Sequence, residues 1–576
     1  MGIPGYARII IKKYPKIYNK TENVNFLFMD YNSLMYFVKN NLMDKENKLY
    51  EIGKLSDTKY EKILINKILD YTKHIITDIV KPNKLVYIAL DGTPPFAKMV
   101  QQRLRRFKKK KDYDIEKLVY GKNKKQWNTN NFTPGTNFMF NFSNKMQKFI
   151  NDNNFSTHLD RNLRVIFSDS SVPGEGEHKL IPYIRKLKVK NTDTFGIYGM
   201  DADLIVLSML TDKNIFIINE TDNRFTNDTS EFMSLNVNMF KNYFMKELEL
   251  DNYDHNNIIH DYVFLTFLGG NDFVKSIRFL KIRDGGLDIM LKIYKKILNN
   301  RKDFLITNDF NINSDFFKQL INDLSNIEDS NLKIIQKKIN SFKHNHSYDP
   351  DDEKEKIKSY YQHTFYYDEV NPYYKKLKPL FDKLNFLKKY KNNYYDLLFE
   401  LNPITDDYLN TICKEYLISL IWTLKYYLTG KVPNWKWSYP FRAAPLLVDF
   451  NNYLSKNNYD DEFKEEKPYL PLQQLMFVLP PTDKKILPKK YLNLMINDDS
   501  PIIEFYPDDF ELDYLDGLKY IYSEPVLPDL DTDLIIDSIK KIKLTIKEKK
   551  RNKINDTPVY FNFGNGKISN SNRTYK

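Results

Sequence analysis

Short apolar runs alternate with longer helical patterns through the first half of the chain. Five runs have the β-rich, apolar character of buried strands, at residues 25–29, 85–90, 163–167, 195–199 and 214–219. Helical spacing fills most of the intervals between them. The pattern therefore predicts an α/β fold, in which a mostly parallel, twisted sheet is flanked by helices.

The pattern changes further along the chain. We expect a first unit at residues 1–300 and a polar linker or insertion at residues 301–370, with 344–355 exposed. A second, aromatic-rich and largely helical region at residues 371–540 is expected to pack against the first unit. Residues 541–576 are basic and rich in Gly, Asn and Ser towards their end, which predicts a flexible tail.

Composition excludes several classes of protein. The single cysteine, Cys413, excludes a disulfide framework and a zinc site built from several cysteines. It fits an intracellular protein; we favour the cytoplasm, with the nucleus as the alternative. No apolar run is long enough to span a membrane, so no membrane association is expected. The formal net charge of +13 suits a polyanionic partner such as nucleic acid, but it is weak evidence alone.

Carboxylates follow the predicted strands. Because ligands bind beyond the carboxyl ends of strands in an open α/β sheet, these acids should converge. A Gly-Gly pair precedes the last of them. The set is Asp30, Asp91, Glu175, Glu177, Asp201, Asp203 and Asp272.

Seven carboxylates in one cleft need cations to offset their repulsion. Oxygen ligands favour Mg²⁺, with Mn²⁺ as the alternative. Two such ions about 4 Å apart would stabilise the attacking and leaving oxygens of a phosphodiester displacement. The simpler explanation is that each acid caps or favours a helix N-terminus. It suits any one position, but not the whole set.

A basic helix face follows one of these acids. Lys98, Gln102, Arg105 and Arg106 are spaced i, i+4, i+7 and i+8, which places them on one side of a helix. Such donors can surround a terminal phosphate. A solvated basic helix is the alternative, and the position directly after Asp91 argues against it. A 5′ phosphate held beside two metals implies an end-dependent exonuclease.

The combined motifs resemble the Xrn family of 5′→3′ exoribonucleases, a branch of the flap-endonuclease-like (PIN-like) nucleases. In the first unit the matching strings are Met1-Gly2-Ile3-Pro4, Asp91-Gly92, Gln101-Gln102-Arg103-Leu104-Arg105-Arg106, Val172-Pro173-Gly174-Glu175-Gly176-Glu177, Asp201-Ala202-Asp203 and Gly269-Gly270-Asn271-Asp272. In the second region they include Tyr426-Tyr427, Trp435-Lys436-Trp437 and Phe505-Tyr506-Pro507.

The resemblance implies roles for these positions. The seven acids match the family's metal ligands, and Lys98, Gln102, Arg105 and Arg106 match its 5′-monophosphate pocket. The family stacks the terminal base between a His and a Trp; here Tyr36 occupies the His position, and the Trp is Trp435 or Trp437. The chain resembles a minimal form without the accessory C-terminal domains.

The function expected from the resemblance is processive 5′→3′ degradation of 5′-monophosphorylated, single-stranded RNA to nucleoside 5′-monophosphates. We also expect the hydrolysis to use two metal ions and the enzyme to be a monomer. Its expected role is mRNA decay, with a decapping enzyme as a partner. The alternatives are a structure-specific flap-type DNA nuclease and a catalytically silent RNA-binding scaffold. The match in the second region argues against the first, and the intact acid set argues against the second.

Overall fold

The computed structural model describes residues 2–120, 125–152, 155, 163–199, 201–222, 230–250, 252–344, 388–401, 403–457, 462–483, 485–513, 523–564 and 567–568. Its centre is a nine-stranded sheet with the strand order β1-β7-β6-β5-β2-β3-β4-β10-β11. The strands are β1 (Tyr18–Lys20), β2 (Phe26–Asp30), β3 (Leu85–Ala89), β4 (Arg164–Ser168), β5 (Thr194–Tyr198), β6 (Asn214–Glu220), β7 (Phe232–Asn236), β10 (Val559–Gly564) and β11 (Lys567–Ile568).

The five strands expected from the sequence are the five central ones, and they run parallel to one another. This confirms the predicted α/β fold class. Antiparallel strands extend the sheet on both sides, β7 beside β6 and β10 beside β4. A separate pair is formed by β8 (Leu512–Asp513) and β9 (Glu524–Pro525).

Helices cover both faces of the sheet because its strands are apolar on both sides. In β2, Leu27 and Met29 pack with one set of helices, whereas Phe26 and Phe28 pack with the other. The first set is α2 (Tyr31–Asn41), α4 (Asp57–His74) and α6 (Asn137–Asn151). The second set includes α1 (Tyr6–Lys13), α7 (Gly176–Lys186), α8 (Ala202–Met209) and α9 (Val237–Leu248).

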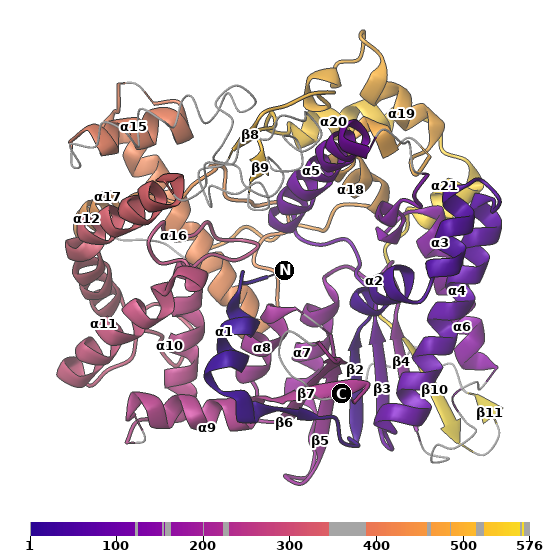
Figure 1. Ribbon diagram of the computed structural model, residues 1–576, viewed down its shortest axis with the longest axis horizontal. Coiled ribbons are helices and arrows are strands. Elements are labelled where there is room, and N and C mark those ends of the chain that lie inside the picture. Colours follow the sequence, from indigo (N-terminus) through magenta and orange to yellow (C-terminus); the bar gives the residue numbers. More distant parts are fainter. Residues whose placement is uncertain are drawn as a thin grey trace.

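The other helices surround this core, and α5 stands above the sheet in Figure 1. They are α3 (Asp44–Glu51), α5 (Phe96–Tyr120), α10 (His255–Leu268), α11 (Gly286–Arg301), α12 (Ser314–His344), α15 (Lys388–Phe399), α16 (Asp406–Thr429), α17 (Leu447–Lys456), α18 (Pro471–Val478), α19 (Lys489–Ile496), α20 (Thr532–Lys540) and α21 (Ile546–Arg551). Across the described ranges, no helix has the length and apolarity needed to cross a membrane.

Two segments differ from the expectation. The predicted linker contains α12, whose Phe316, Phe317 and Leu320 are buried, so much of residues 301–344 is packed structure. The predicted flexible tail contains α21 and β10, and β10 pairs with β4 because it completes the hydrogen bonds of that strand's edge. Residues 345–370 and 569–576, which share these predictions, lie outside the described residues.

Candidate active site

A cleft of about 820 Å³ lies at the carboxyl ends of β2 and β3, and we call it the acid cleft. The structure brings six of the seven predicted acids together on its walls: Asp30, Asp91, Glu175, Glu177, Asp201 and Asp272. The seventh, Asp203, is buried. Its carboxyl group interacts electrostatically with Asp272 and Lys98, which shows that it lies beside the other acids. The strand-end rule thus places these side chains in one region.

The strands position the first two acids. Asp30 is the last residue of β2, and Asp91 follows the end of β3. The Asn32 amide donates a hydrogen bond of 2.7 Å to Asp91, and the backbone N–H of Gly176 donates another of 2.9 Å. A Cβ on Gly176 would lie 2.3 Å from an oxygen of Asp30, so only glycine allows α7 to begin this close to the strand.

The beginning of α7 supplies the next two acids. One oxygen each from Asp30, Asp91 and Glu177 lie within 4.8 Å of one another, and Glu175, Glu177 and His178 form a second group of the same compactness. The His178 ring stacks on Tyr426 of α16 with a centroid distance of 3.7 Å. Tyr426 of the second region therefore packs against the start of α7, where two of the acids lie.

Burial and mutual repulsion change the acidity of these groups. Burial raises the pKa of Asp30 well above its usual range, and Asp91 and Asp201 raise it further. Burial and Glu175 do the same to the pKa of Glu177. Burial, aided by Asp272, raises the pKa of Asp203 to about 7. The cluster therefore has more negative charge than its surroundings offset.

Lys98 of α5 supplies a positive charge within the cluster. Its ammonium forms ion pairs with Glu175 and, at 2.7 Å, with Asp272. Burial alone would lower the pKa of Lys98, but Asp272 and Glu175 hold it well above its usual value. Burial would likewise raise the pKa of Asp272, and Lys98 instead keeps it below its usual value.

The donor set fits a divalent metal. Asp203 has a buried carboxylate oxygen without a hydrogen-bond partner among the described residues. Carboxylate oxygens predominate in the two compact groups, which is the ligand chemistry of hard divalent cations. A bound cation would offset the repulsion that raises the pKa values of Asp30, Glu177 and Asp203.

The predicted basic face of α5 points into the same cleft. Lys98, Gln102, Arg105 and Arg106 all line it. Arg106 donates a hydrogen bond of 2.8 Å to Thr133, while its other terminal nitrogen is buried and has no partner among the described residues. Burial lowers the pKa of Arg106 to about 10, so the guanidinium stays charged at neutral pH.

The aromatic residues lie in different places. Tyr36 lines the acid cleft with 42% of its surface exposed, and its ring meets that of Phe132 edge-on at 5.0 Å. Trp435 and Trp437 are not among the described residues that line this cleft. The Trp435 carbonyl accepts a hydrogen bond from the N–H of Phe96 at the start of α5, and Trp437 stacks on Trp422.

Sequence reasoning missed several residues of the cleft. Lys109 also lines it, and its position three residues after Arg106 continues the same helix face. Asn32 orients Asp91, and Gln474 of α18 donates a hydrogen bond of 3.2 Å to Gln102. The spacing of α5 could have indicated Lys109, whereas no local pattern connects Gln474 with Gln102.

Two family models match the chain. The model described as XRN 5'-3' exonuclease N-terminus matches residues 1–221, and the model described as Xrn1 helical domain matches residues 252–376 and 378–575. The match to the second model covers more than half of the chain.

Curated relatives agree with these matches. A 5'-3' exoribonuclease 2 homolog of Drosophila melanogaster is 29% identical, over 86% of this chain and 64% of its own length. Human 5'-3' exoribonuclease 1 is 28% identical, over 96% of this chain and 35% of its own length. Candida albicans 5'-3' exoribonuclease 2 is 27% identical, over 100% of this chain and 76% of its own length.

The chain spans less than two thirds of the length of the Drosophila and human relatives. The two family models nevertheless match consecutive parts of it, and the acids and cations of the first-unit motifs meet in one cleft. The chain belongs to the XRN 5'-3' exonuclease family.

Proposed function

We propose that this chain is a processive, Mg²⁺-dependent 5′→3′ exoribonuclease. Its substrate is single-stranded RNA with a 5′ monophosphate, and its products are nucleoside 5′-monophosphates. Mn²⁺ can replace Mg²⁺, and two ions bind. The family membership and the printed names of the relatives, which are exoribonucleases, support RNA as the substrate.

The arrangement of acids and cations in the acid cleft supports this proposal. The acid cleft holds the acid cluster at one end of the basic face of α5 and Arg106 two turns further along the same helix. Lys98 and Arg106 are separated by eight residues, which is about 12 Å along a helix axis. A terminal phosphate at Arg106 therefore places a phosphodiester near the acids, and an internal segment of RNA lacks that anchor.

Each set of residues then has a separate task. Lys98, Gln102, Arg105 and Arg106 hold the terminal phosphate. Arg106 can donate from the nitrogen that has no partner among the described residues. Tyr36 offers an exposed ring on which the terminal base can stack. Trp435 or Trp437 as the opposite side of that stack stays a prediction.

The acids Asp30, Asp91, Glu175, Glu177, Asp201, Asp203 and Asp272 would hold the metal. When bound, such ions lower the pKa of a water molecule and stabilise the charge that develops on the phosphate. In the hydrolysis, the water oxygen bonds to phosphorus, the bond from phosphorus to the 3′ oxygen breaks, and that oxygen takes up a proton. The phosphate stays on the shortened strand, which is then a new 5′-monophosphorylated substrate.

The proposed cellular role follows from the requirement for a 5′ monophosphate on the RNA. We expect the basic pocket to reject a cap or a triphosphate by its size and limited donors, and we therefore propose a decapping enzyme as the partner that supplies the ends. We place the monomeric enzyme in mRNA decay, in the cytoplasm rather than the nucleus. We also propose that residues 1–300 form the nuclease unit and residues 371–540 the helical unit.

The test compares one RNA with three ends: 5′ phosphate, 5′ hydroxyl and cap. With Mg²⁺, we expect rapid loss of the phosphorylated RNA from its 5′ end, slow loss of the other two, and no loss after EDTA is added. Equal degradation of all three RNAs would contradict recognition of the 5′ phosphate. Faster cleavage of a DNA flap than of RNA would instead identify a flap-type nuclease.

Two variants test the metal-binding acids and the phosphate-binding face of α5 separately. Asp201→Ala combined with Asp203→Ala should abolish cleavage and leave RNA binding intact. Arg106→Gln removes a charged hydrogen bond worth roughly 1.5–3 kcal/mol, so kcat/KM on phosphorylated RNA should fall about 10- to 100-fold. Arg164→Gln, at an exposed position at the start of β4, is the matched control and should change neither.

A further inference from the structure

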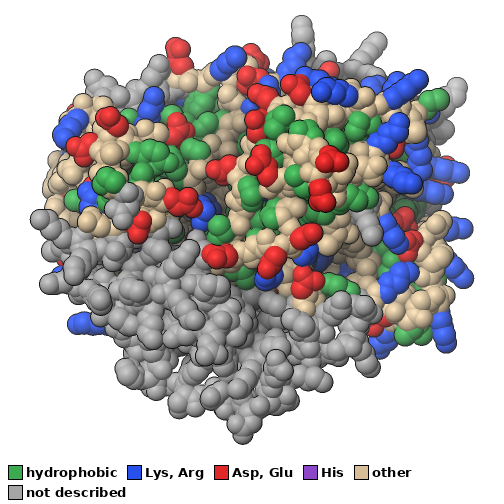
Figure 2. All heavy atoms as spheres, turned by 90° about the horizontal axis from the view of Figure 1, so that it is seen from above, with side chains coloured by type: hydrophobic (Ala, Val, Ile, Leu, Met, Phe, Trp, Pro, Cys, Tyr) green, Lys and Arg blue, Asp and Glu red, His purple; other side chains and the backbone are tan. Residues whose placement is uncertain are grey.

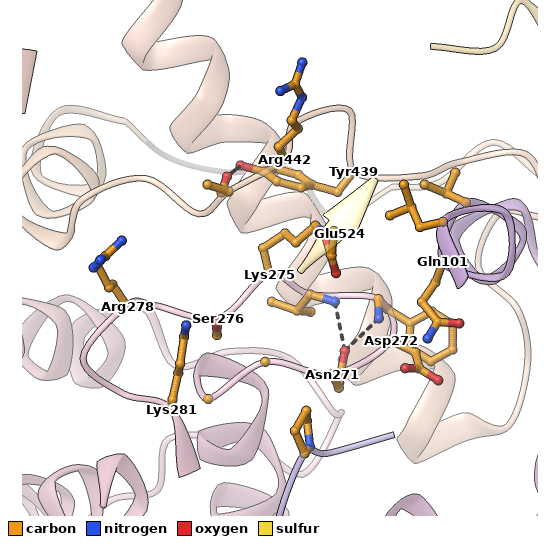
Figure 3. A pocket seen from close by; sticks show the side chains of 18 of the residues that line it. Gln101, Asn271, Asp272, Lys275, Ser276, Arg278, Lys281, Tyr439, Arg442 and Glu524 are labelled. Atoms are coloured by element: carbon orange, nitrogen blue, oxygen red, sulfur yellow. Dashed lines mark hydrogen bonds and ion pairs between the residues drawn. The ribbon is translucent and has the colours of Figure 1, made fainter. Parts of the chain in front are cut away.

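A second cleft, of about 420 Å³, is lined by the loop that carries Asp272, by α5 and by residues of the second region (Figure 3). We call it the cationic cleft. Helix α5 and the ion pair between Lys98 and Asp272 stand between it and the acid cleft, so the two clefts are separate sites. The volume of the cationic cleft is within the range of sites that hold a small ligand.

Cations outnumber acids on the walls of the cationic cleft. The acids are Asp272, Asp513 and Glu524, and the cations are Lys275, Arg278, Lys281, Arg283 and Arg442. Lys98 offsets the charge of Asp272, and Lys275 pairs with Glu524 at 2.9 Å. The other residues leave an excess of positive charge, which favours an anionic ligand.

Arg278 is the cation most available to such a ligand. Arg283 and Arg442 each form an ion pair with an acid outside the cleft, whereas no ion pair or hydrogen bond of the Arg278 side chain is found within the described ranges. Arg278 is also partly exposed. A guanidinium with free, paired N–H groups is suited to a phosphate, which can accept two of them at once.

The loop that carries these cations is held in one conformation. The Asn271 side-chain oxygen accepts hydrogen bonds from the N–H groups of Phe273 and Val274, at 2.9 and 2.8 Å. Gly270 has a φ of 91°, and a Cβ there would lie 2.7 Å from Ser276, so two parts of the loop pack closely. The site is therefore preformed, and a ligand binds to it with a smaller loss of entropy.

The α5 side of the cationic cleft differs in chemistry. Ala97, Val100 and Leu104 form an apolar wall there. The Gln101 side-chain oxygen and the Asn271 amide nitrogen are buried without a hydrogen-bond partner among the described residues. Polar atoms of this kind are usually satisfied by water or a ligand. A nucleobase offers an apolar face to such a wall, and its edge has both donors and acceptors for the two polar atoms.

The two parts of the cleft lie apart in Figure 3, with Arg278 and Lys281 at one end of the view and Gln101 at the other. We propose that the cationic cleft binds a nucleoside 5′-monophosphate, with its phosphate on Arg278 and its base against α5. The inference rests on the proposed function only for the source of this ligand, because hydrolysis of RNA would release nucleoside 5′-monophosphates.

The experiment is calorimetric titration of the full chain with adenosine 5′-monophosphate, ribose 5-phosphate and adenosine. The nucleotide can also bind the phosphate-binding face of α5, so we expect two nucleotides per wild-type chain. Arg278→Gln should weaken one binding event about 10- to 100-fold, the effect of losing a charged hydrogen bond, and leave the other unchanged. Arg106→Gln should have the opposite effect. The Arg278-dependent event should be weaker with ribose 5-phosphate or adenosine than with the nucleotide.

Two further variants serve as controls. Arg278→Lys keeps the charge without the paired N–H groups and should weaken the same event less than Arg278→Gln does. Arg164→Gln removes an equal charge at the amino end of β4 and should change neither event.

A single binding event that only Arg106→Gln weakens would place the nucleotide in the acid cleft and overturn the proposal. Equal affinity for the nucleotide and ribose 5-phosphate in the Arg278-dependent event would overturn the position of the base against α5. RNA cleavage by the wild-type chain is measured separately. Its absence would contradict the proposed function, and the titration would still decide whether the cationic cleft holds a nucleotide.

Discussion

Lys98 is a cation that pairs with two acids of the acidic cluster. The ammonium lies between Glu175 and Asp272, two acids that come from different parts of the chain. Lys98 keeps the pKa of Asp272 below its usual value, whereas burial keeps the pKa of Glu175 raised despite the same ammonium, and the pKa values of Asp30 and Glu177 are raised as well. Lys98 alone therefore leaves repulsion within the cluster, and a bound cation should lower the pKa values that remain raised.

Gly2 is a residue whose small size the site requires. A Cβ there would lie 2.1 Å from the Asp203 carboxyl carbon, and its φ of 41° already disfavours a side chain. Gly2→Ala should therefore displace Asp203 and reduce kcat more than KM, because an acid that we assign to the metal moves. The check is RNA cleavage over a range of Mg²⁺ concentrations.

Gly53→Ala provides the comparison for this variant. Gly53 also has a positive φ, of 72°, but no atom lies within 4 Å of the added Cβ. Backbone strain is thus common to both variants, and only Gly2→Ala has the clash. Equal activity of the two variants would show that Gly2 does not position Asp203.

At the scale of elements, one buried carboxyl group joins α12 to the start of α17, in addition to the packing of the two helices. Glu328 of α12 accepts hydrogen bonds from the N–H groups of Leu447 and Val448 at the start of α17, at 2.9 and 3.1 Å. It thereby satisfies two of the donors that every helix N-terminus leaves free. Burial nevertheless raises the pKa of Glu328 to about 7.

The raised pKa makes part of the stability depend on pH. Between about pH 4.5 and 7 the folded chain retains the Glu328 proton and the unfolded chain releases it, so the free energy of unfolding falls as pH rises. Glu328→Gln should remove this slope, which amounts to roughly 3 kcal/mol over the interval. Thermal unfolding of both proteins at several pH values is the measurement. A constant difference between them would show that Glu328 does not titrate in this range.

The sequence predicted elements whose pattern is local. The central strands are apolar runs that end near an acid, and α5 has an uninterrupted basic face, so strand ends and helix spacing indicated most of the acid cleft. Strands β7 and β10 join the parallel strands in the antiparallel direction and are defined by the partners they meet, and the apolar residues of α12 are dispersed in a polar sequence. Such elements depend on tertiary contacts that a local pattern does not encode.

At the scale of the molecule, the two matched regions share one hydrophobic core. A single cluster of buried side chains extends from Ile3 to Ile539 and includes residues of both regions. Seen from above, Lys and Arg side chains gather along one margin, on the side of α19 and α21 (Figure 2). The Lys and Arg side chains are therefore unevenly distributed over the described part of this face.

Arg103 of α5 connects the two regions within that core. It is 3% exposed and donates hydrogen bonds to the carbonyl groups of Phe477 and Phe505, the second at 2.6 Å. Arg103→Met leaves both carbonyl groups without this donor, so it should lower the free energy of unfolding by roughly 2–3 kcal/mol. We expect the wild type and the variant each to unfold in one transition. Tryptophan fluorescence and far-UV circular dichroism are the measurements of unfolding.

Arg164→Met is the exposed control and should leave the unfolding midpoint within error. Two separated transitions in the wild type would mean that the regions fold independently, contrary to a shared core.

The pairing of β10 with β4 has a consequence for synthesis. Strand β4 is translated several hundred residues before β10 emerges from the ribosome, and its open edge has no partner in the sheet during that interval. An unpaired edge of this kind readily accepts a strand from another chain. The nascent chain thus has a long period of vulnerability to aggregation, and a molecular chaperone that covers β4 would protect it until its own last strands arrive.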